Sequence, residues 1–204
     1  AAEQKISYQK SHDLGTGFFN RNAFESQLNH LLLPSQTKSN RPVAVVHIGF
    51  TNGRRIQSRY GYEGLDKVLI EYRERLGCID DIEVITARPT SVDLAIAFSA
   101  PNLQHRLDEL CKHLVEIGHS EFLIDNDKVH LHAFIGIAVS HKGQEASSLL
   151  QNSSEAMLAC KDSGQKYAYY SQSHTENQSH INQLESYLLQ AVRNDDLMLY
   201  FQPK

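Results

Sequence analysis

Apolar residues recur every three or four positions in four stretches of the chain, which is typical of helices packed on one face. These stretches are 21–33, 61–76, 101–118 and 145–161. The third is the clearest, because its leucines share one face and because Pro101 lies at its start and Gly118 at its end. Gly164 is placed to end the fourth helix.

Shorter runs rich in apolar and β-branched residues predict the strands between these helices. The predicted strands are 43–50, 83–86, 92–98, 130–139 and 167–170. Turn residues separate them at 89–91, and a short hairpin turning at 125–127 is expected to lead into the fourth strand. Because strands outnumber single crossovers, the pattern indicates an α+β fold, with a mixed or antiparallel sheet flanked by helices.

The composition fits one domain with appended pieces. With 204 residues and 41% hydrophobic content, the chain can bury one core. Its apolar runs are too short to span a bilayer, and no secretion signal opens it. The net charge of −4, with dispersed basic residues, argues against nucleic-acid binding. Three scattered cysteines favour a reducing, cytoplasmic location and argue against disulfides or a zinc site.

Eleven histidines raise the question of a metal site. His130 and His132 are expected to share one face of the strand over 130–139. A third ligand at a suitable spacing is missing, so we interpret both as surface or packing residues.

Four blocks of the sequence match, in order, the motifs of the GGDEF family. The first, 12–21, resembles D-x-L-T-G-L-x-N-R, with Gly15 and Phe18 at the two Leu positions. The second, 47–66, resembles D-x-D-x-F-K-x-I-N-D-x-x-G-H-x-x-G-D, and the third, 87–95, stands in the place of A-R-x-G-G-D-E-F-A. The fourth, 134–138 with 156–164, resembles S-I-G-I-A and A-M-Y-x-A-K-x-x-G. The resemblance implies a nucleotidyl-cyclase-like fold over residues 12–171.

An active member of this family condenses two GTP molecules into cyclic di-GMP, which needs carboxylates to hold a divalent metal. The resemblance places those acids at Gly49 and Val92, and neither side chain can coordinate Mg²⁺. Thr90 and Ser91 replace the paired glycines of the signature turn, so their side chains restrict the approach of a nucleotide. Asp93 matches the remaining acid, but one carboxylate is a poor metal cage. We therefore expect no catalytic residues and no metal site.

The resemblance leaves some nucleotide-binding positions in place. Asp66 matches the guanine-contacting Asp, and Gln57 replaces an Asn that reads the same base edge. Lys161 matches a phosphate-contacting Lys, and Arg54 keeps the charge of another. Gln165 stands where a second basic contact is usual. Plain surface charges explain Asp66 and Lys161 equally well, and Mg²⁺ and GTP are expected as ligands only if this residual binding persists.

The family's product-inhibition motif, R-x-x-D, should lie just before the signature turn. Asp81 and Val84 occupy its two positions. An acid in place of the Arg repels a phosphate, so feedback binding of cyclic di-GMP is not expected.

The chain is expected to divide into four parts. Residues 1–11 form the tail of a signalling helix, 12–171 a degenerate GGDEF domain, 172–180 a linker, and 181–204 a helix and the first strand of a truncated EAL domain. The tail ending in Tyr200-Phe201-Gln202-Pro203 resembles the entry of an EAL domain. The resemblance therefore implies an upstream sensor and a downstream EAL domain as partners, a homodimer as a further arrangement, and no membrane segment within this fragment.

Three interpretations of function follow. The favoured one is an inactive GGDEF domain that regulates a larger cyclic di-GMP signalling protein and can retain weak GTP binding. The second is a working diguanylate cyclase, in which Asp93 and Asp66 would have to replace the metal ligands. The third is a purely structural connector. Whether the EAL domain hydrolyses or only binds cyclic di-GMP depends on residues beyond Lys204.

Overall fold

The computed structural model describes residues 8–33, 41–77 and 84–171, together with residues 188, 190, 192 and 193. The chain divides into two compact units, Ala1–Tyr170 and Ser171–Lys204. In the second unit, the described residues 188, 190, 192 and 193 are helical, and Ser171 is not. The predicted linker and the predicted EAL strand lie outside the described residues.

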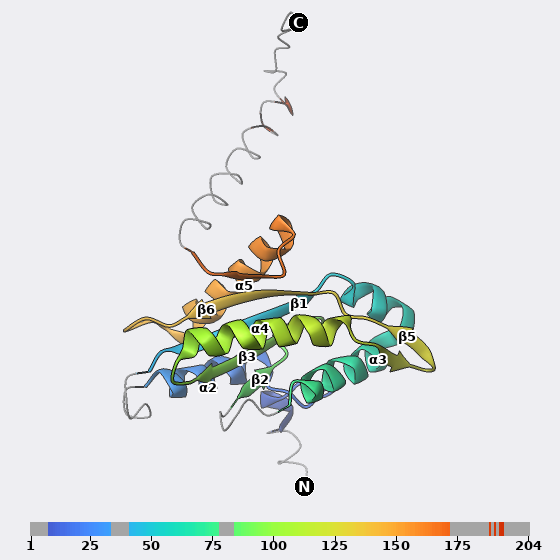
Figure 1. Ribbon diagram of the computed structural model, residues 1–204, viewed down its shortest axis with the longest axis horizontal. Coiled ribbons are helices and arrows are strands. Elements are labelled where there is room, and N and C mark those ends of the chain that lie inside the picture. Colours follow the sequence, from blue (N-terminus) through green and yellow to red (C-terminus); the bar gives the residue numbers. More distant parts are fainter. Residues whose placement is uncertain are drawn as a thin grey trace, which may run out of the picture. The chain divides into compact units, whose positions relative to one another are not determined.

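The first unit alternates helices and strands along the chain (Figure 1). The helices are α2 (Arg21–Leu32), α3 (Gly53–Arg75), α4 (Leu103–His119) and α5 (Ala146–Ser163). The strands are β1 (Val43–Phe50), β2 (Ile85–Ala87), β3 (Leu94–Ser99), β4 (Phe122–Ile124), β5 (Asp127–Val129), β6 (Ala133–Val139) and β7 (Tyr167–Tyr169).

Five strands form one sheet in the order β2-β3-β1-β6-β7. The long strand β1 lies at its centre and pairs antiparallel with both β3 and β6, whereas β7 pairs parallel with β6. The strands β4 and β5 form a separate hairpin. This mixed sheet flanked by helices confirms the predicted fold class.

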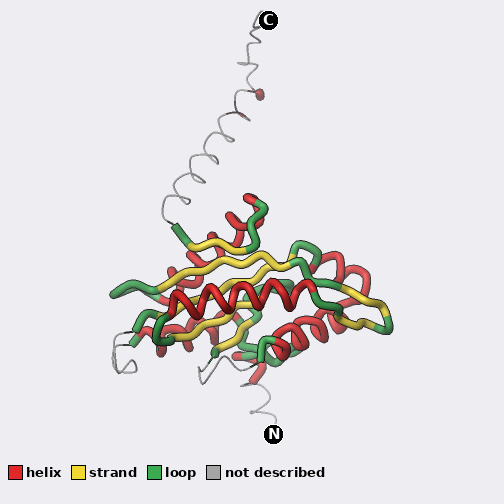
Figure 2. The backbone as a smooth tube through the Cα atoms, viewed as in Figure 1, coloured by secondary structure: helices red, strands yellow, loops and turns green. Residues whose placement is uncertain are grey.

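Helices cover both faces of the sheet (Figure 2). Alternate residues of β1 point to opposite faces, as a strand requires. Ala44, Val46 and Ile48 pack in one core with α3 and α4, and Val43 and Val45 pack in a second core with α2 and α5. Because both faces are covered, all eight residues of β1 are buried.

Helix α3 is longer than the predicted helix over 61–76, because it begins at Gly53 and bends at Gly61. Gly61 has φ 74° and ψ −177°, a conformation open almost exclusively to glycine. The first half, over 53–60, escaped prediction because it carries a single buried apolar side chain, Ile56. The second half carries the periodic apolar residues that the sequence shows.

The predicted strand over 130–139 is too long, since β6 begins at Ala133. Residues 130–132 connect β5 to β6, so His130 and His132 do not share a strand face. Leu131 is buried, but its amide donates to the carbonyl of Gly118 at the end of α4 instead of to a neighbouring strand. The hairpin turn is confirmed, with Asp125 and Asn126 both at positive φ. The remaining boundaries agree with prediction to within about two residues.

Candidate functional site

The first motif forms a turn that is fastened to the edge of the sheet. Asn20 caps α2 by accepting a hydrogen bond from the amide of Ala23 at 3.0 Å. Just before it, Phe19 pairs with Ala87 of β2, and the amide of Arg88 donates to the Phe19 carbonyl at 2.8 Å. The N-terminal turn and the signature turn after β2 therefore lie side by side.

Asp13 organises the N-terminal turn. Its carboxylate accepts hydrogen bonds from the amide of Thr16 at 2.9 Å and from the hydroxyl of Thr16 at 2.7 Å. Burial alone would raise the pKa of Asp13, but the hydrogen bonds from Thr16 and Arg88 outweigh it and hold the pKa below its ordinary value. Asp13 is therefore a charged acceptor at neutral pH.

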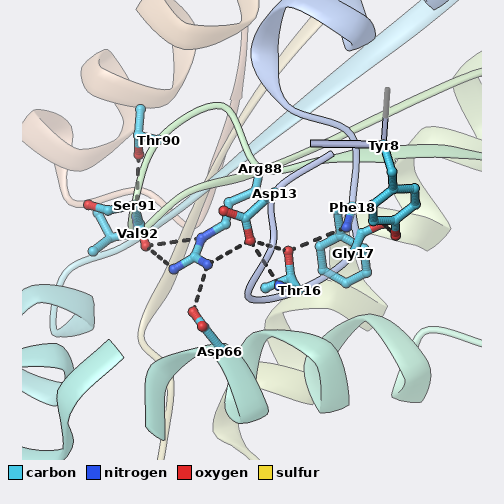
Figure 3. A network of polar contacts seen from close by, with 10 residues as sticks. All are labelled: Tyr8, Asp13, Thr16, Gly17, Phe18, Asp66, Arg88, Thr90, Ser91 and Val92. Atoms are coloured by element: carbon cyan, nitrogen blue, oxygen red, sulfur yellow. Dashed lines mark hydrogen bonds and ion pairs between the residues drawn. The ribbon is translucent and has the colours of Figure 1, made fainter. Parts of the chain in front are cut away.

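Arg88 lies between two carboxylates (Figure 3). Its Nη1 is 2.9 Å from Asp13 and 2.6 Å from Asp66, and its side chain is 5% exposed. The other guanidinium nitrogens donate to the carbonyl of Ser91, at 3.2 and 2.6 Å. The rigid fork of arginine thus joins the N-terminal turn, α3 and the signature turn in one network, which we call the Arg88 cluster: Asp13, Asp66 and Arg88.

Asp66 is held more closely than its sequence position suggested. One carboxylate oxygen accepts from Arg88, and the other lies against the backbone of Gly15. A Cβ atom at Gly15 would lie 2.7 Å from Cγ of Asp66 and closer still to its Oδ2. Gly15, which stands at a Leu position of the family motif, therefore gives the carboxylate the space it occupies.

The other predicted nucleotide contacts fall in two places. Arg54 is exposed on the first turn of α3, and Gln57 follows one turn later with its side-chain nitrogen buried and without a hydrogen-bond partner. Lys161 lies at the far end of α5, where its ammonium is 5.8 Å from the ring centre of Phe134. Among the described residues, Asp66 contacts Arg88 and Lys161 lies near Phe134, and none of these contacts joins the two places.

A cavity of about 230 Å³ opens beside Lys161. The ends of α4, β1 and α5 and the start of β6 contribute its walls. Its basic lining residues are His119, His132, Lys161 and Lys166, and none of the described lining residues is acidic. Asn52 fixes one wall, because its side chain donates to the carbonyl of His130 at 2.7 Å and accepts from the amide of His132 at 3.1 Å.

The two positions where the resemblance places metal ligands lie in apolar surroundings. Val92 packs against the core beside α3, and a Cβ atom at Gly53 would lie 3.3 Å from it. Gly49, the last but one residue of β1, faces the ring of Phe134 on β6. Asp93 accepts a hydrogen bond from the hydroxyl of Thr90 at 2.7 Å. Among the described residues, no three of His, Cys, Asp or Glu gather as metal ligands would.

These positions do not fit a divalent metal. Mg²⁺ takes oxygen ligands at short distances in octahedral geometry, and a glycine, a valine and a phenyl ring supply none from their side chains. In the described part of the chain, no histidine gathers with two other possible ligands to replace them, and His130 directs Nδ1 to the backbone carbonyls of His119 and Ser120 at 3.0 and 3.1 Å.

His47 was not predicted as a functional residue, because it lies within the apolar run of β1. It is 3% exposed, and neither ring nitrogen has a hydrogen-bond partner. Burial lowers the pKa of His47 to about 4, although the nearby charge of Asp93 raises it and that of Arg21 lowers it further. The imidazole is therefore neutral at physiological pH, and a histidine inside an apolar run was the signal that could have found it.

No helix in the described part of the chain has the length and apolar character needed to cross a membrane. Cys111 and Cys160 are buried free thiols. Burial raises the pKa of the Cys111 thiol to about 12, so it is protonated and unreactive at neutral pH.

Comparison with known sequences places these features in a family. The family model described as "Diguanylate cyclase, GGDEF domain" matches residues 10–167. The chain is 23% identical to the cyclic di-GMP phosphodiesterase PdeR of Escherichia coli, covering 100% of this chain and 30% of PdeR. It is 27% identical to MucR of Pseudomonas aeruginosa, a bifunctional diguanylate cyclase and cyclic di-GMP phosphodiesterase, covering 100% of this chain and 30% of MucR. The chain thus spans about a third of the length of these relatives.

Solved structures share the fold. The GGDEF domain of TpbB (YfiN) from Pseudomonas aeruginosa superposes with a TM-score of 0.72 at 20% identity, over 82% of this chain and 99% of that one. The GGDEF domain of FimX from the same organism superposes with a TM-score of 0.61 at 19% identity, over 78% of this chain and 97% of that one.

Proposed function

This chain belongs to the GGDEF family, and we propose that it is a catalytically inactive member that regulates a larger cyclic di-GMP signalling protein. The family model matches most of the first compact unit. In the described part of that unit, a five-stranded sheet is flanked by the helices α2 to α5 and packs on two cores. Regulation by such a domain would rest on its surfaces and its ligands, since its reaction centre lacks the required acids.

The observation that carries this proposal is the pair of residues at the metal-ligand positions. Gly49 and Val92 have no atom in their side chains that can coordinate a cation. Without a metal, the charge that develops on the phosphates is not neutralised, and the attacking 3′-hydroxyl is not activated. The remaining acid, Asp93, accepts a hydrogen bond from Thr90, and the described residues gather no group of three His, Cys, Asp or Glu that could hold a metal ion.

Residual GTP binding is the second part of the proposal. Arg54 and Lys161 would contact phosphate, and Gln57 and Asp66 would contact the base. The buried, unpartnered amide nitrogen of Gln57 supports a ligand there, because such a donor is costly to leave unsatisfied. The ion pair of Asp66 with Arg88 opposes tight binding, because guanine would share a carboxylate whose charge is already compensated. We therefore expect weak binding.

We infer that the domain does not bind cyclic di-GMP through the family's inhibitory motif. Asp81 lies outside the described residues, and Val84, which stands at the acidic position of that motif, packs against the core. A half-buried valine offers no charged or polar contact to the ligand.

The partners proposed for this domain are an upstream sensor, a downstream EAL domain and a second copy of the chain. The names of PdeR and MucR support the EAL assignment, because both denote cyclic di-GMP phosphodiesterase activity in longer proteins. Phosphodiesterase activity of the whole protein would then belong to the EAL part, and this fragment would set its level. A connector without ligands remains the competing function if no nucleotide binds.

The proposal is tested by incubating the chain with GTP and Mg²⁺ or Mn²⁺ and separating the products by chromatography. We expect no cyclic di-GMP at any protein concentration, while an active diguanylate cyclase assayed alongside converts GTP under the same conditions. Product that forms in proportion to the protein and disappears in the Asp93→Ala variant would contradict the proposal and identify Asp93 as a catalytic acid.

A further inference from the structure

We propose that Phe134 keeps divalent cations out of this domain, because its ring fills the space that a ligand side chain at position 49 requires. This inference rests on the proposed loss of catalysis and gives it a structural cause. The domain would then have lost its metal site through two linked changes, one that removed the acid and one that filled the space.

The first step is the contact between Gly49 and Phe134. The two residues are directly opposite each other on β1 and β6. A Cβ atom at Gly49 would lie 2.6 Å from Cε2 of Phe134, closer still to its Cζ, and 2.9 Å from Sδ of Met157. Side chains essentially never approach so closely, so a residue larger than glycine requires the ring to move.

The second step is that the ring has little room to move. Phe134 is 8% exposed and forms a small core with Met157 and Cys160 of α5. Two residues further along β6, a Cβ atom at Gly136 would collide with the backbone of Met157 and Ser153. The helix α5 therefore lies directly on the backbone of β6, and it holds Met157 against the ring.

The third step is the chemistry around the ring. The S-I-G-I-A motif has a serine where Phe134 stands, so a small hydroxyl side chain is replaced by a phenyl ring. A phenyl ring offers no oxygen to a cation, and its burial with a thioether and a thiol makes the surroundings apolar. The ammonium of Lys161, 5.8 Å from the ring centre, adds a positive charge that repels a second cation.

The first test is a double-mutant cycle between positions 49 and 134, read by thermal unfolding. Gly49→Ala adds only the Cβ atom, and Phe134→Leu removes the outer edge of the ring. In the natural background, Gly49→Ala should lower Tm by roughly 5 °C. In the Phe134→Leu background the same change should leave Tm nearly unchanged or raise it, because alanine is less costly than glycine in a strand. An equal loss in both backgrounds would overturn the proposal. A Gly49→Ala variant that folds only in the Phe134→Leu background would support it.

The second test uses Mn²⁺ alone as the probe. Gly49→Asp with Val92→Asp restores both acids that the family resemblance implies, and this two-acid variant is compared with and without Phe134→Ser. At tenfold its dissociation constant, Mn²⁺ should raise Tm by about 3 °C in the variant that carries Phe134→Ser. Mn²⁺ should not change the Tm of the natural protein or of the two-acid variant that keeps Phe134.

Equal stabilisation by Mn²⁺ with Phe134 in place would overturn the proposal, and so would a failure of the Phe134→Ser combination either to fold or to bind Mn²⁺. Folding of the acid variants only when Phe134 is replaced would support it. These readouts do not depend on GTP turnover. Cyclic di-GMP synthesis by the natural protein would therefore refute the proposed function, whereas the result of the cycle decides the role of Phe134.

Discussion

The Arg88 cluster and the contact of Gly49 with Phe134 lie on motifs of the same family, but they have changed in opposite ways. Arg88 holds two carboxylates from distant parts of the chain. At Gly49 the acid expected from the motif is absent, and an aromatic ring occupies its place. The Arg88 cluster joins three segments of the fold, whereas the acid that is absent at position 49 would be needed for chemistry alone. The difference indicates that the polar contacts that persist here are those on which folding depends.

The strongest test of this difference is to remove Arg88. Arg88→Ala leaves Asp13 and Asp66 as partly buried carboxylates without their cation, and we expect a loss of about 3 kcal/mol in the free energy of unfolding. Arg88→Lys should lose less, because it keeps the charge but not the fork that reaches both acids and Ser91. Urea denaturation measures both variants.

The matched control is Arg59→Ala, which breaks an ion pair with Asp127 whose side chains are 69% and 53% exposed. An exposed pair of this kind contributes at most about 1 kcal/mol. If Arg88→Ala were no more damaging than this control, the Arg88 cluster would not be a folding contact, and the contrast between the two regions would fail.

His47 makes stability depend on pH. It lies on β1, two residues from Gly49, and neither of its ring nitrogens has a hydrogen-bond partner. Its folded pKa of about 4 lies below the ordinary value of 6.5. The unfolded chain therefore binds a proton between pH 6.5 and 4 that the folded chain does not, so stability falls as the pH decreases through this window. We expect a loss on the order of 3 kcal/mol from this group, and no such dependence above about pH 7.

His47→Leu should abolish the part of the pH dependence of stability that His47 causes. Chemical denaturation of both proteins at pH 7.5, 6, 5 and 4.5 gives the difference in stability, in which the carboxylates common to both cancel. The difference should widen in favour of the variant toward low pH. A constant difference would mean that His47 has the same pKa in the folded and the unfolded chain, so that the folded protein accommodates the charged imidazole, most directly through the charge of Asp93.

The smallest expected effect is stabilisation by nucleotide, and it tests whether the Arg88 cluster has kept any binding role. GTP near its dissociation constant stabilises by about 0.4 kcal/mol, which raises Tm by about 1 °C. Asp66→Ala should remove this shift and the preference for GTP over ATP, because the carboxylate pairs with donors on the guanine edge. Lys161→Ala should weaken both nucleotides alike. Asp162→Ala, an exposed neighbour, serves as the control.

The shift on adding nucleotide is the quantity to compare, since Asp66→Ala also lowers the starting Tm by removing a partner of Arg88. If GTP still raised Tm in the Asp66→Ala variant, Asp66 would pair with Arg88 and would not contact the nucleotide. Absence of any shift in the natural protein would leave the domain as a structural connector.

The sequence predicted the fold well where apolar residues repeat clearly. The leucines of α4 and the apolar run of β1 define their elements by themselves. The first half of α3 has too few buried side chains to show a period, and the alternation around Leu131 imitates a strand although the segment caps α4. Local periodicity does not reveal which backbone groups pair over a distance.

The site was predicted less completely for the same reason. The sequence shows directly that positions 49 and 92 lack acids, and it identifies the candidate contacts at positions 54, 57, 66 and 161. It does not show which residues these side chains contact in the fold. Arg88 lies 75 residues from Asp13 and 22 from Asp66, and an apolar residue such as Phe134 within a strand gives no sign that it fills a former polar position.

The bend at Gly61 divides α3 into two parts with different resistance to local opening. The second half buries Leu65, Val68, Leu69 and Tyr72 in the main core, whereas the first half buries the one apolar side chain of Ile56. A segment with few buried apolar contacts opens at a lower free energy than the global transition. We therefore expect the first half, with Arg54 and Gln57, to open locally at a lower free energy than the second half, which holds Asp66 in its ion pair with Arg88.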